Sequence, residues 1–185
     1  EYQLSLFKKY GFKKFLLLTG YKSKMIENFL KEKKLSKNVK IIKDKKKLGT
    51  GGALLNSVQF LDREFCLIYG DILTNMNLKK MSLFFKKING DSCLVINKNN
   101  NYKDSNLITI DKEKKVKNFY FYPHKKIPKN SYSNEAIFMF KKRFFKNLNI
   151  KHLVNKPDLV KNIFPLVKQK KKVYAFKSNE FIIDC

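Results

Sequence analysis

Two aspartates follow apolar runs of the kind expected in buried strands. Asp71 comes after Phe65–Tyr69 and Gly70, and Asp184 comes directly after Phe181–Ile183. Ligands of an open α/β sheet bind beyond the carboxyl ends of its strands, and Mg²⁺ is commonly held by one or two carboxylates together with substrate phosphates. Because the aspartates lie 113 positions apart (184 − 71), only the fold can bring them together. Gly-Asp after a strand is also a common turn, so the sequence leaves both interpretations open.

A glycine-rich segment, Leu48–Gly52, stands between a predicted strand at 39–42 and a predicted helix at 53–60. Glycines let a ligand approach the backbone closely, and a helix N-terminus favours an anion or a polar base edge. A tight, well-capped turn is the alternative interpretation. The segment is neither a P-loop nor a G-x-G-x-x-G motif, because no Gly-Lys-Thr/Ser follows and the glycine spacing differs.

The spacing of apolar residues predicts the elements that position these segments. In the first hundred residues, short apolar runs alternate with helical periodicity: strands at 15–19, 39–42, 65–69 and 92–96, and helices at 4–10, 25–30, 53–60 and 78–88. After residue 100 the pattern gives strands at 107–110, 116–122, 136–140, 173–176 and 181–183, with a helix at 158–167. This alternation predicts a three-layer α/β fold with a mostly parallel, doubly wound sheet and an antiparallel extension.

The chain has a high positive charge, but its lysine-rich composition is typical of a general compositional bias and not of selection for a polyanionic partner. Of 185 residues, 41 are Lys or Arg and 15 are Asp or Glu, for a net charge of +26, yet only Arg63 and Arg143 are arginines. Arginine is the residue suited to bidentate contacts with bases and phosphates, so no specific nucleic-acid partner is expected. The 43% hydrophobic and 14% aromatic shares exclude a disordered basic tail. No apolar run approaches the roughly 18 residues of a membrane span.

The cysteines and histidines favour neither a disulfide scaffold nor structural zinc. Cys66, Cys93 and Cys185 form no C-x-x-C pair, and His124 and His152 are far apart. Unpaired cysteines within apolar runs fit a reducing cytoplasm.

Read in order, several segments resemble the sugar-1-phosphate nucleotidyltransferases, a family with a GT-A-like α/β fold. They are Leu18–Tyr21, Leu48–Gly52, Tyr69–Asp71, Ser133–Ala136 and Ile182–Asp184. The resemblance implies in-line attack of a sugar-phosphate oxygen on the α-phosphorus of an NTP, with release of pyrophosphate. Catalysis of this kind depends on positioning and charge neutralisation.

A narrower resemblance is to the heptose- or mannose-1-phosphate guanylyltransferase-like branch, which is often fused to a HAD-type phosphatase. It rests on Asn99–Asn101, Asp104–Leu107, Tyr122–His124, Asp158-Leu159 and Pro165. This branch implies GTP, a sugar such as D-glycero-D-manno-heptose 1-phosphate, and a cytoplasmic, bacterial-type role in nucleotide-sugar and lipopolysaccharide biosynthesis.

The resemblance also implies the roles of individual residues. Asp71 and Asp184 would be catalytic and hold Mg²⁺. Asp44 would meet a guanine edge, with a solvated charge in a Lys-rich loop as the alternative, and Lys125 or Lys126 would contact the sugar phosphate. The full substrate-binding set is Gly49, Thr50, Gly51, Gly70, Asp44, Asn134, Glu135 and Lys125.

The sequence also departs from the family pattern. The Gly-Gly-x-Gly-Thr-Arg-Leu loop of the family is absent, Tyr122 replaces its Lys, Ala136 replaces a Gly, and Cys185 stands where the closing motif continues differently. We therefore expect 1–185 to be one nucleotidyltransferase domain without its N-terminal strand and phosphate loop, and inactive alone. An open apolar groove should then flank the 15–19 or 65–69 strand. The alternative from another class is a basic, non-catalytic binding or regulatory module, and the sequence leaves the oligomeric state open.

Overall fold

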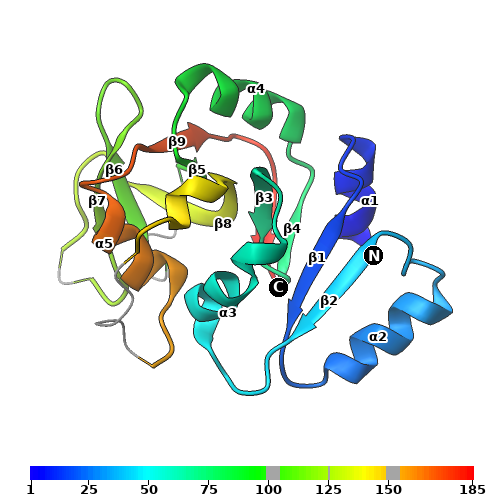
Figure 1. Cartoon of the computed structure of the whole chain (residues 1–185). Helices are drawn as coiled ribbons and strands as arrows, with labels where there is room; N and C mark the ends of the chain where they lie inside the picture. Colours follow the sequence, from blue (N-terminus) through cyan, green and yellow to red (C-terminus); the bar gives the residue numbers. More distant parts are fainter. Residues whose placement is uncertain (99–104, 125, 149–154) are drawn as a thin grey trace.

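The computed structural model describes residues 1–98, 105–124, 126–148 and 155–185 (Figure 1). The helices are α1 (Tyr2–Lys9), α2 (Ser23–Glu32), α3 (Gly49–Ser57), α4 (Leu78–Ile88) and α5 (Phe164–Val167), with 3₁₀ turns η1 (Val58–Phe60) and η2 (Lys142–Phe145) and the π-helix η4 (Leu159–Ile163). The strands are β1 (Phe15–Thr19), β2 (Val39–Lys43), β3 (Glu64–Ile68), β4 (Ile72–Thr74), β5 (Ser92–Asn97), β6 (Leu107–Ile110), β7 (Val116–Tyr120), β8 (Tyr132–Lys141), β9 (Val173–Lys177) and β10 (Ile182–Asp184).

The expected α/β fold with an antiparallel extension is confirmed, and its sheet is mixed. The path β7-β6-β8-β5-β9 is joined by β3, which pairs with the second half of β8. The pairs β1–β2 and β5–β9 are parallel, whereas β8 runs antiparallel to β3, β5 and β6. Two strands of the doubly wound half, β3 and β5, are therefore separated by β8 instead of lying side by side.

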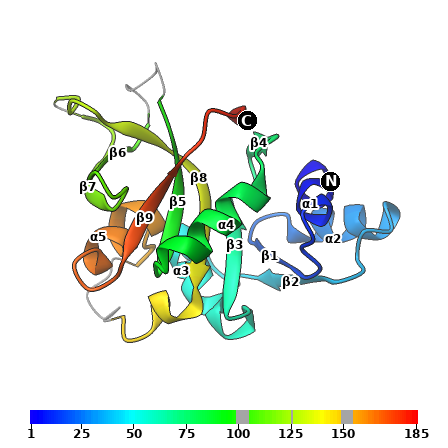
Figure 2. The same ribbon diagram turned by 90° about the horizontal axis from the view of Figure 1, so that it is seen from above.

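Helices cover both faces of this sheet. Because the pleat points successive side chains to opposite faces, apolar residues of one strand can join a core on each side. Successive residues of β8 point to opposite sides: Ile137 and Met139 join a core with α1 and α4, whereas Phe138 and Phe140 join one with α3, η4 and α5. Figures 1 and 2 show α4 on one side of the sheet and α5 on the other. The second core contains packed aromatic rings: Phe138 and Phe140 are stacked with their centroids 5.8 Å apart, and Phe140 and Phe144 are tilted with theirs 5.1 Å apart.

Strands β1 and β2 form a separate two-stranded sheet beside the main one. Phe15 pairs with Val39 and Thr19 with Lys43. In the described ranges, β1 pairs only with β2 and β3 pairs only with β8, so each keeps one free edge. Figure 2 shows β1 and β2, with α1 and α2, set to one side of β3.

Several boundaries differ from those predicted. Helix α3 begins at Gly49, four residues earlier than expected, and the 158–167 helix begins as the π-helix η4. The short strand β4 has no signal of its own and exists because β10 pairs with it. Within the ranges that the structure describes, no helix is both long enough and apolar enough to cross a bilayer.

Candidate functional site at the carboxyl ends of β1 and β3

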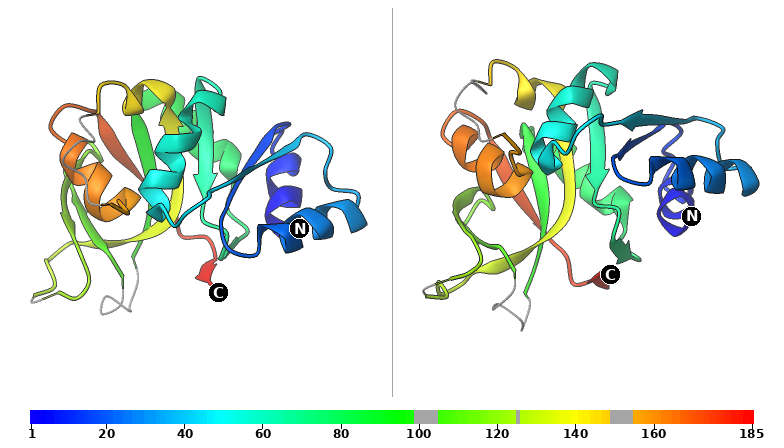
Figure 3. Two further views of the ribbon diagram at one scale, coloured as in Figure 1. Left: turned by 60° about the horizontal axis from the view of Figure 1, so that its bottom comes forward. Right: turned by 90° about the horizontal axis from the view of Figure 1, so that it is seen from below.

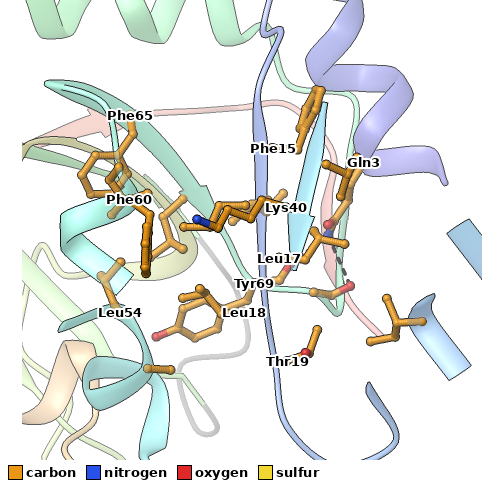
Figure 4. Close-up of a pocket in the computed structure, with 18 of the residues that line it drawn as sticks. Gln3, Phe15, Leu17, Leu18, Thr19, Lys40, Leu54, Phe60, Phe65 and Tyr69 are labelled. Carbon is orange, nitrogen blue, oxygen red and sulfur yellow. Dashed lines mark hydrogen bonds between the residues drawn. The ribbon is translucent and has the colours of Figure 1, made fainter. Parts of the chain in front are cut away.

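A groove of about 1800 Å³ lies between β1 and β3. All residues of 15–19 and 64–71 line it, so the expected apolar groove is confirmed and lies beside both strands. Figure 4 shows Phe15 and Phe65 toward one end of the groove, and Thr19 and Tyr69 toward the other. The two strands therefore run in the same direction.

Side chains cross the groove at the amino ends of β1 and β3. The Nζ of Lys14 lies 3.5 Å from Oδ1 of Asp62, so the residues that precede the two strands are side by side. Lys40 extends from β2 over the ring of Phe60, with its Nζ 3.7 Å from the ring centroid (Figure 4). These contacts are exposed and each contributes at most about 1 kcal/mol.

The carboxyl end of the groove contains most of the nucleotide-side residues predicted from the sequence. Asp44, Gly49, Thr50, Gly70 and Asp71 all line it. Lysines border the same region, namely Lys22, Lys43, Lys45, Lys46 and Lys47. A Cβ on Gly70 would meet no described atom within 4 Å, so the groove is open at that residue.

The two predicted metal ligands lie on paired segments. Asp184 pairs with Ile72 in the antiparallel β10–β4 ladder, and the backbone N–H of Cys185 donates to the carbonyl of Asp71 at 2.9 Å. Figure 3 shows the C-terminal segment beside β4. Both aspartates are exposed. The described ranges hold no cluster of three or more His, Cys, Asp or Glu side chains that could bind a metal. The pairing therefore brings the backbones of the two residues together. A carboxylate at this place suits Mg²⁺, which takes its remaining ligands from water and phosphates.

The Leu48–Gly52 segment packs against another part of the chain. Gly49 has φ +75°, and a Cβ there would lie 2.8 Å from the carbonyl oxygen of Lys156. A Cβ on Gly51 would lie 2.8 Å from the carbonyl oxygen of Pro157, which accepts hydrogen bonds from the N–H groups of Gly51 (2.8 Å) and Gly52 (3.2 Å). This packing accounts for glycine at 49 and 51 without a ligand. It also occupies two of the N–H groups that an anion at the start of α3 would need.

Thr50 is fixed in the same contact. Its hydroxyl donates to Oδ2 of Asp158 at 2.9 Å and accepts from the N–H of Leu159 at 2.9 Å. The other carboxylate oxygen of Asp158 accepts from the N–H groups of Val160 and Lys161. Asp158 therefore caps η4 and, through Thr50, links η4 to α3.

The predicted sugar-side residues Asn134 and Glu135 lie on β8 beside the end of β3, outside the lining of the groove. The N–H of Tyr69 donates to the carbonyl of Ala136 at 3.2 Å, which places both next to the Gly70-Asp71 turn. The Oδ1 of Asn134 is buried without a hydrogen-bond partner among the described residues. An unpaired buried acceptor is costly unless a ligand or water supplies a donor.

Glu135 is half-buried, and its carboxylate accepts a hydrogen bond from the Ser133 hydroxyl. Burial raises the pKa of the Glu135 carboxyl, and the hydrogen bond from Ser133 offsets part of that rise. The folded protein therefore holds the proton more tightly than the unfolded chain, and stability falls as pH rises from the unfolded pKa through the folded pKa.

Replacing Glu135 by Gln should therefore stabilise the protein at neutral pH. The amide keeps an acceptor for Ser133 and removes the buried charge, so the gain in Tm over wild type should be small at pH 4 and larger at pH 8. Thermal unfolding across this range measures the effect, with the exposed Glu113→Gln as the matched control. A difference in Tm that is the same at both pH values would contradict the assignment.

Ala136 stands where the sequence motif of the resembled family has glycine. Its φ is +52°, in the left-handed region that costs an L-residue about 1–2 kcal/mol. Replacing Ala136 by Gly relieves this strain, offset by about 0.4–1 kcal/mol of added freedom in the unfolded chain.

We expect Ala136→Gly to stabilise the fold by about 0.5–1 kcal/mol in urea unfolding. The same change at Ala175, which is fully buried in β9, should instead destabilise it, because a strand glycine gains no relief from strain there. An Ala136→Gly variant less stable than wild type would show that this φ carries no strain.

Some predicted residues cannot be placed. Lys125 lies outside the described residues, as do Asn99–Asn101 and Asp104. Tyr122, which stands where the family has lysine, is 48% exposed, and its N–H donates to Oδ1 of Asn106 at 3.3 Å.

Sequence reasoning missed Gln3. Its side-chain amide donates to the carbonyl oxygens of Tyr69 (2.8 Å) and Ile72 (2.7 Å), with Gly70 at 3.3 Å. A lone glutamine in a predicted helix gives no signal for such a contact.

Comparison with known proteins gives a consistent result. The sequence model of the nucleotidyl transferase family matches residues 1–181. A D-glycero-alpha-D-manno-heptose 1-phosphate guanylyltransferase of Campylobacter jejuni subsp. jejuni is 23% identical over 184 residues, which covers 100% of this chain and 78% of that protein.

Solved structures share the fold. HddC from Yersinia pseudotuberculosis, complexed with GMP-PN, superposes with a TM-score of 0.78 at 18% identity and covers 99% of this chain and 78% of its own. The inositol-1-phosphate CTP transferase from T. maritima has a TM-score of 0.78 at 17% identity, over 100% of this chain and 74% of its own.

Proposed function

We propose that this chain, which belongs to the nucleotidyl transferase family, transfers a nucleoside monophosphate from GTP to a heptose or mannose 1-phosphate and releases pyrophosphate. The observation that carries the proposal is the convergence of Asp44, Thr50, Gly70 and Asp71 at the open carboxyl end of the groove. The choice of GTP and of a heptose or mannose is supported by the guanylyltransferase resemblance.

Asp71 and Asp184 are the residues that would hold Mg²⁺. When bound, the metal would neutralise charge on the α-phosphate and orient it. The lysines around the groove, among them Lys22 and Lys43, add positive charge along the path of the phosphates. Positioning and neutralisation of this kind suit a reaction in which the protein forms no covalent bond.

The base and the sugar would lie on opposite sides of the Gly70-Asp71 turn. On one side, Gly49 and Thr50 would contact the base and ribose, and Asp44 would accept hydrogen bonds from a guanine edge. On the other, Asn134 and Glu135 would face the sugar, and the unpartnered Oδ1 of Asn134 supports a hydroxyl donor there. Lys125 would contact the sugar phosphate.

The groove also supports the expectation that these residues form part of a longer domain. It is bounded by the free edges of β1 and β3, and a strand from a preceding segment would pair with both. Such a segment would carry the phosphate loop. The curated relative is longer than this chain, which covers 78% of it.

We place the protein in the cytoplasm, whose reducing conditions suit the three free cysteines. Burial raises the pKa of the Cys66 thiol to about 12 and also raises that of the fully buried Cys93 thiol, so both remain protonated at neutral pH. A fused HAD-type phosphatase and a role in lipopolysaccharide biosynthesis rest on the branch resemblance.

Pyrophosphate release tests the proposal. The intact protein that contains this chain is mixed with Mg²⁺, each NTP and a panel of hexose and heptose 1-phosphates, and GTP with a heptose or mannose 1-phosphate should give the highest kcat/KM. Release with no pair would overturn the transfer activity. Strongly salt-dependent DNA or RNA binding in its place would favour a basic, non-catalytic module.

A further inference from the structure

The turn that carries Asp71 is held by donors from two distant segments. Four successive carbonyl oxygens, those of residues 69–72, each accept a hydrogen bond. Gln3 of α1 supplies the donors for residues 69, 70 and 72, and the N–H of Cys185 supplies the donor for Asp71. Figure 4 shows the Gln3 side chain directed toward this turn at the edge of the groove.

The geometry shows which of these bonds are strong. An amide nitrogen has two hydrogens, and its contacts with the oxygens of Tyr69 (2.8 Å) and Ile72 (2.7 Å) are shorter than its 3.3 Å contact with Gly70. Its two N–H groups therefore bridge the first and last residues of the turn. The turn's own bond, from the N–H of Ile72 to the oxygen of Tyr69, is longer at 3.3 Å. Gln3 is thus the principal link across the turn.

The rest of α1 is anchored separately. Leu4 and Phe7 are buried, Phe7 within the core formed with α4, and the Tyr2 hydroxyl donates to the carbonyl of Thr74 at 2.9 Å. The helix can therefore remain docked when the Gln3 side chain is changed. The Gln3 amide donates to carbonyl oxygens of the turn and does not contribute to the docking of the helix.

We infer that Gln3 is a positioning residue for the proposed metal site, because its amide fixes the backbone that presents the Asp71 carboxylate. The inference rests on the proposed function in one respect, the role of Asp71 toward Mg²⁺. Groups that orient a metal ligand typically change metal affinity about 10–100-fold when they are removed. Gln3 should therefore act on the metal and leave sugar-phosphate binding unchanged.

The test compares Gln3→Met, which keeps the length of the side chain and removes its donors, with Tyr2→Phe, which removes a bond from the same helix turn to Thr74. Mn²⁺ binding to the intact protein in the presence of GTP is followed by electron paramagnetic resonance, alongside the kinetics of transfer. Gln3→Met should weaken Mn²⁺ binding at least about tenfold and raise the Mg²⁺ concentration for half-maximal rate equally, with KM for the sugar phosphate unchanged. Tyr2→Phe should stay within twofold of wild type.

The outcomes separate the two proposals. Wild-type Mn²⁺ affinity in Gln3→Met, or equal losses in both variants, would overturn the role of Gln3. Mn²⁺ binding by the wild type without transfer on any substrate pair would overturn the proposed reaction alone, and the Mn²⁺ comparison would still decide the role of Gln3. Absence of Mn²⁺ binding in the wild type would overturn both.

Discussion

Asp71→Asn is expected to lower the rate of nucleotidyl transfer by the intact protein at least about a thousandfold, with folding nearly unchanged. Asparagine keeps the shape of the side chain and one acceptor oxygen, but it removes the charge that would hold Mg²⁺. The metal contributes several kcal/mol of charge stabilisation, and each 1.36 kcal/mol is about tenfold in rate.

Folding should be little affected because Asp71 is exposed and its bond to the N–H of Cys185 uses the backbone carbonyl. Surface substitutions away from special contacts usually change stability by less than about 0.5 kcal/mol. The measurement is pyrophosphate release together with thermal unfolding, and Asp184→Asn should show a comparable loss. Glu113→Gln, which removes an exposed charge at the β6–β7 turn, is the matched control. If Asp71→Asn retained most of the activity, Asp71 would be a turn residue only.

Where local signals were strong, the sequence predicted the elements correctly. Helix α4 spans Leu78–Ile88 and β1 spans Phe15–Thr19, as predicted. The first has apolar residues at helical spacing and the second is a short continuous apolar run, and both are clear local signals. Helix α3 begins earlier than predicted because its glycines, poor helix formers by themselves, are held by the carbonyl of Pro157. That contact joins segments more than a hundred residues apart and has no local signature.

In the candidate site, too, local sequence signals were informative and contacts between distant segments were not predicted. Gly70-Asp71 and Asp184 were predicted because polar residues after apolar runs indicate the ends of strands. The β4–β10 ladder brings their backbones together, and their role toward a metal stays a prediction. The competing interpretation of the Leu48–Gly52 glycines, a tight and well-capped turn, is not what the structure has: α3 begins at Gly49 without a side-chain cap. Close packing against residues 156–157 accounts for the glycines at 49 and 51. Gln3 was missed because it lies 66 to 69 positions before the carbonyls that it binds.

The groove between β1 and β3 leads to the second large effect, which hydrogen exchange can measure residue by residue. Phe15 donates to Asn38 and Asp44 donates to Thr19, so residues 15, 17 and 19 of β1 face β2. Because alternate residues of a strand bond to opposite sides, the amides of Leu16 and Leu18 face the groove.

The same alternation of backbone amides along β3 shows which of them face the groove from the side opposite β1. Tyr69 donates to the carbonyl of Ala136, so residues 65, 67 and 69 face β8 and the amides of Cys66 and Ile68 face the groove. A strand that filled the groove would run parallel to both neighbours and pair with these four amides. It would be apolar on both faces, as strands covered by helices on each side are.

We therefore expect the amides of Leu16, Leu18, Cys66 and Ile68 to exchange rapidly in residues 1–185 alone. In the intact protein that supplies a preceding segment, each should slow by at least about a hundredfold, since a central ladder opens only with a large part of the sheet. The amides of Leu17 and Leu67, which already face β2 and β8, provide the internal control and should be protected in both. Equal exchange of the four amides in the two proteins would show that no strand enters the groove. The β1–β2 pair would then be a separate sheet, and the groove would be open to substrate along its whole length.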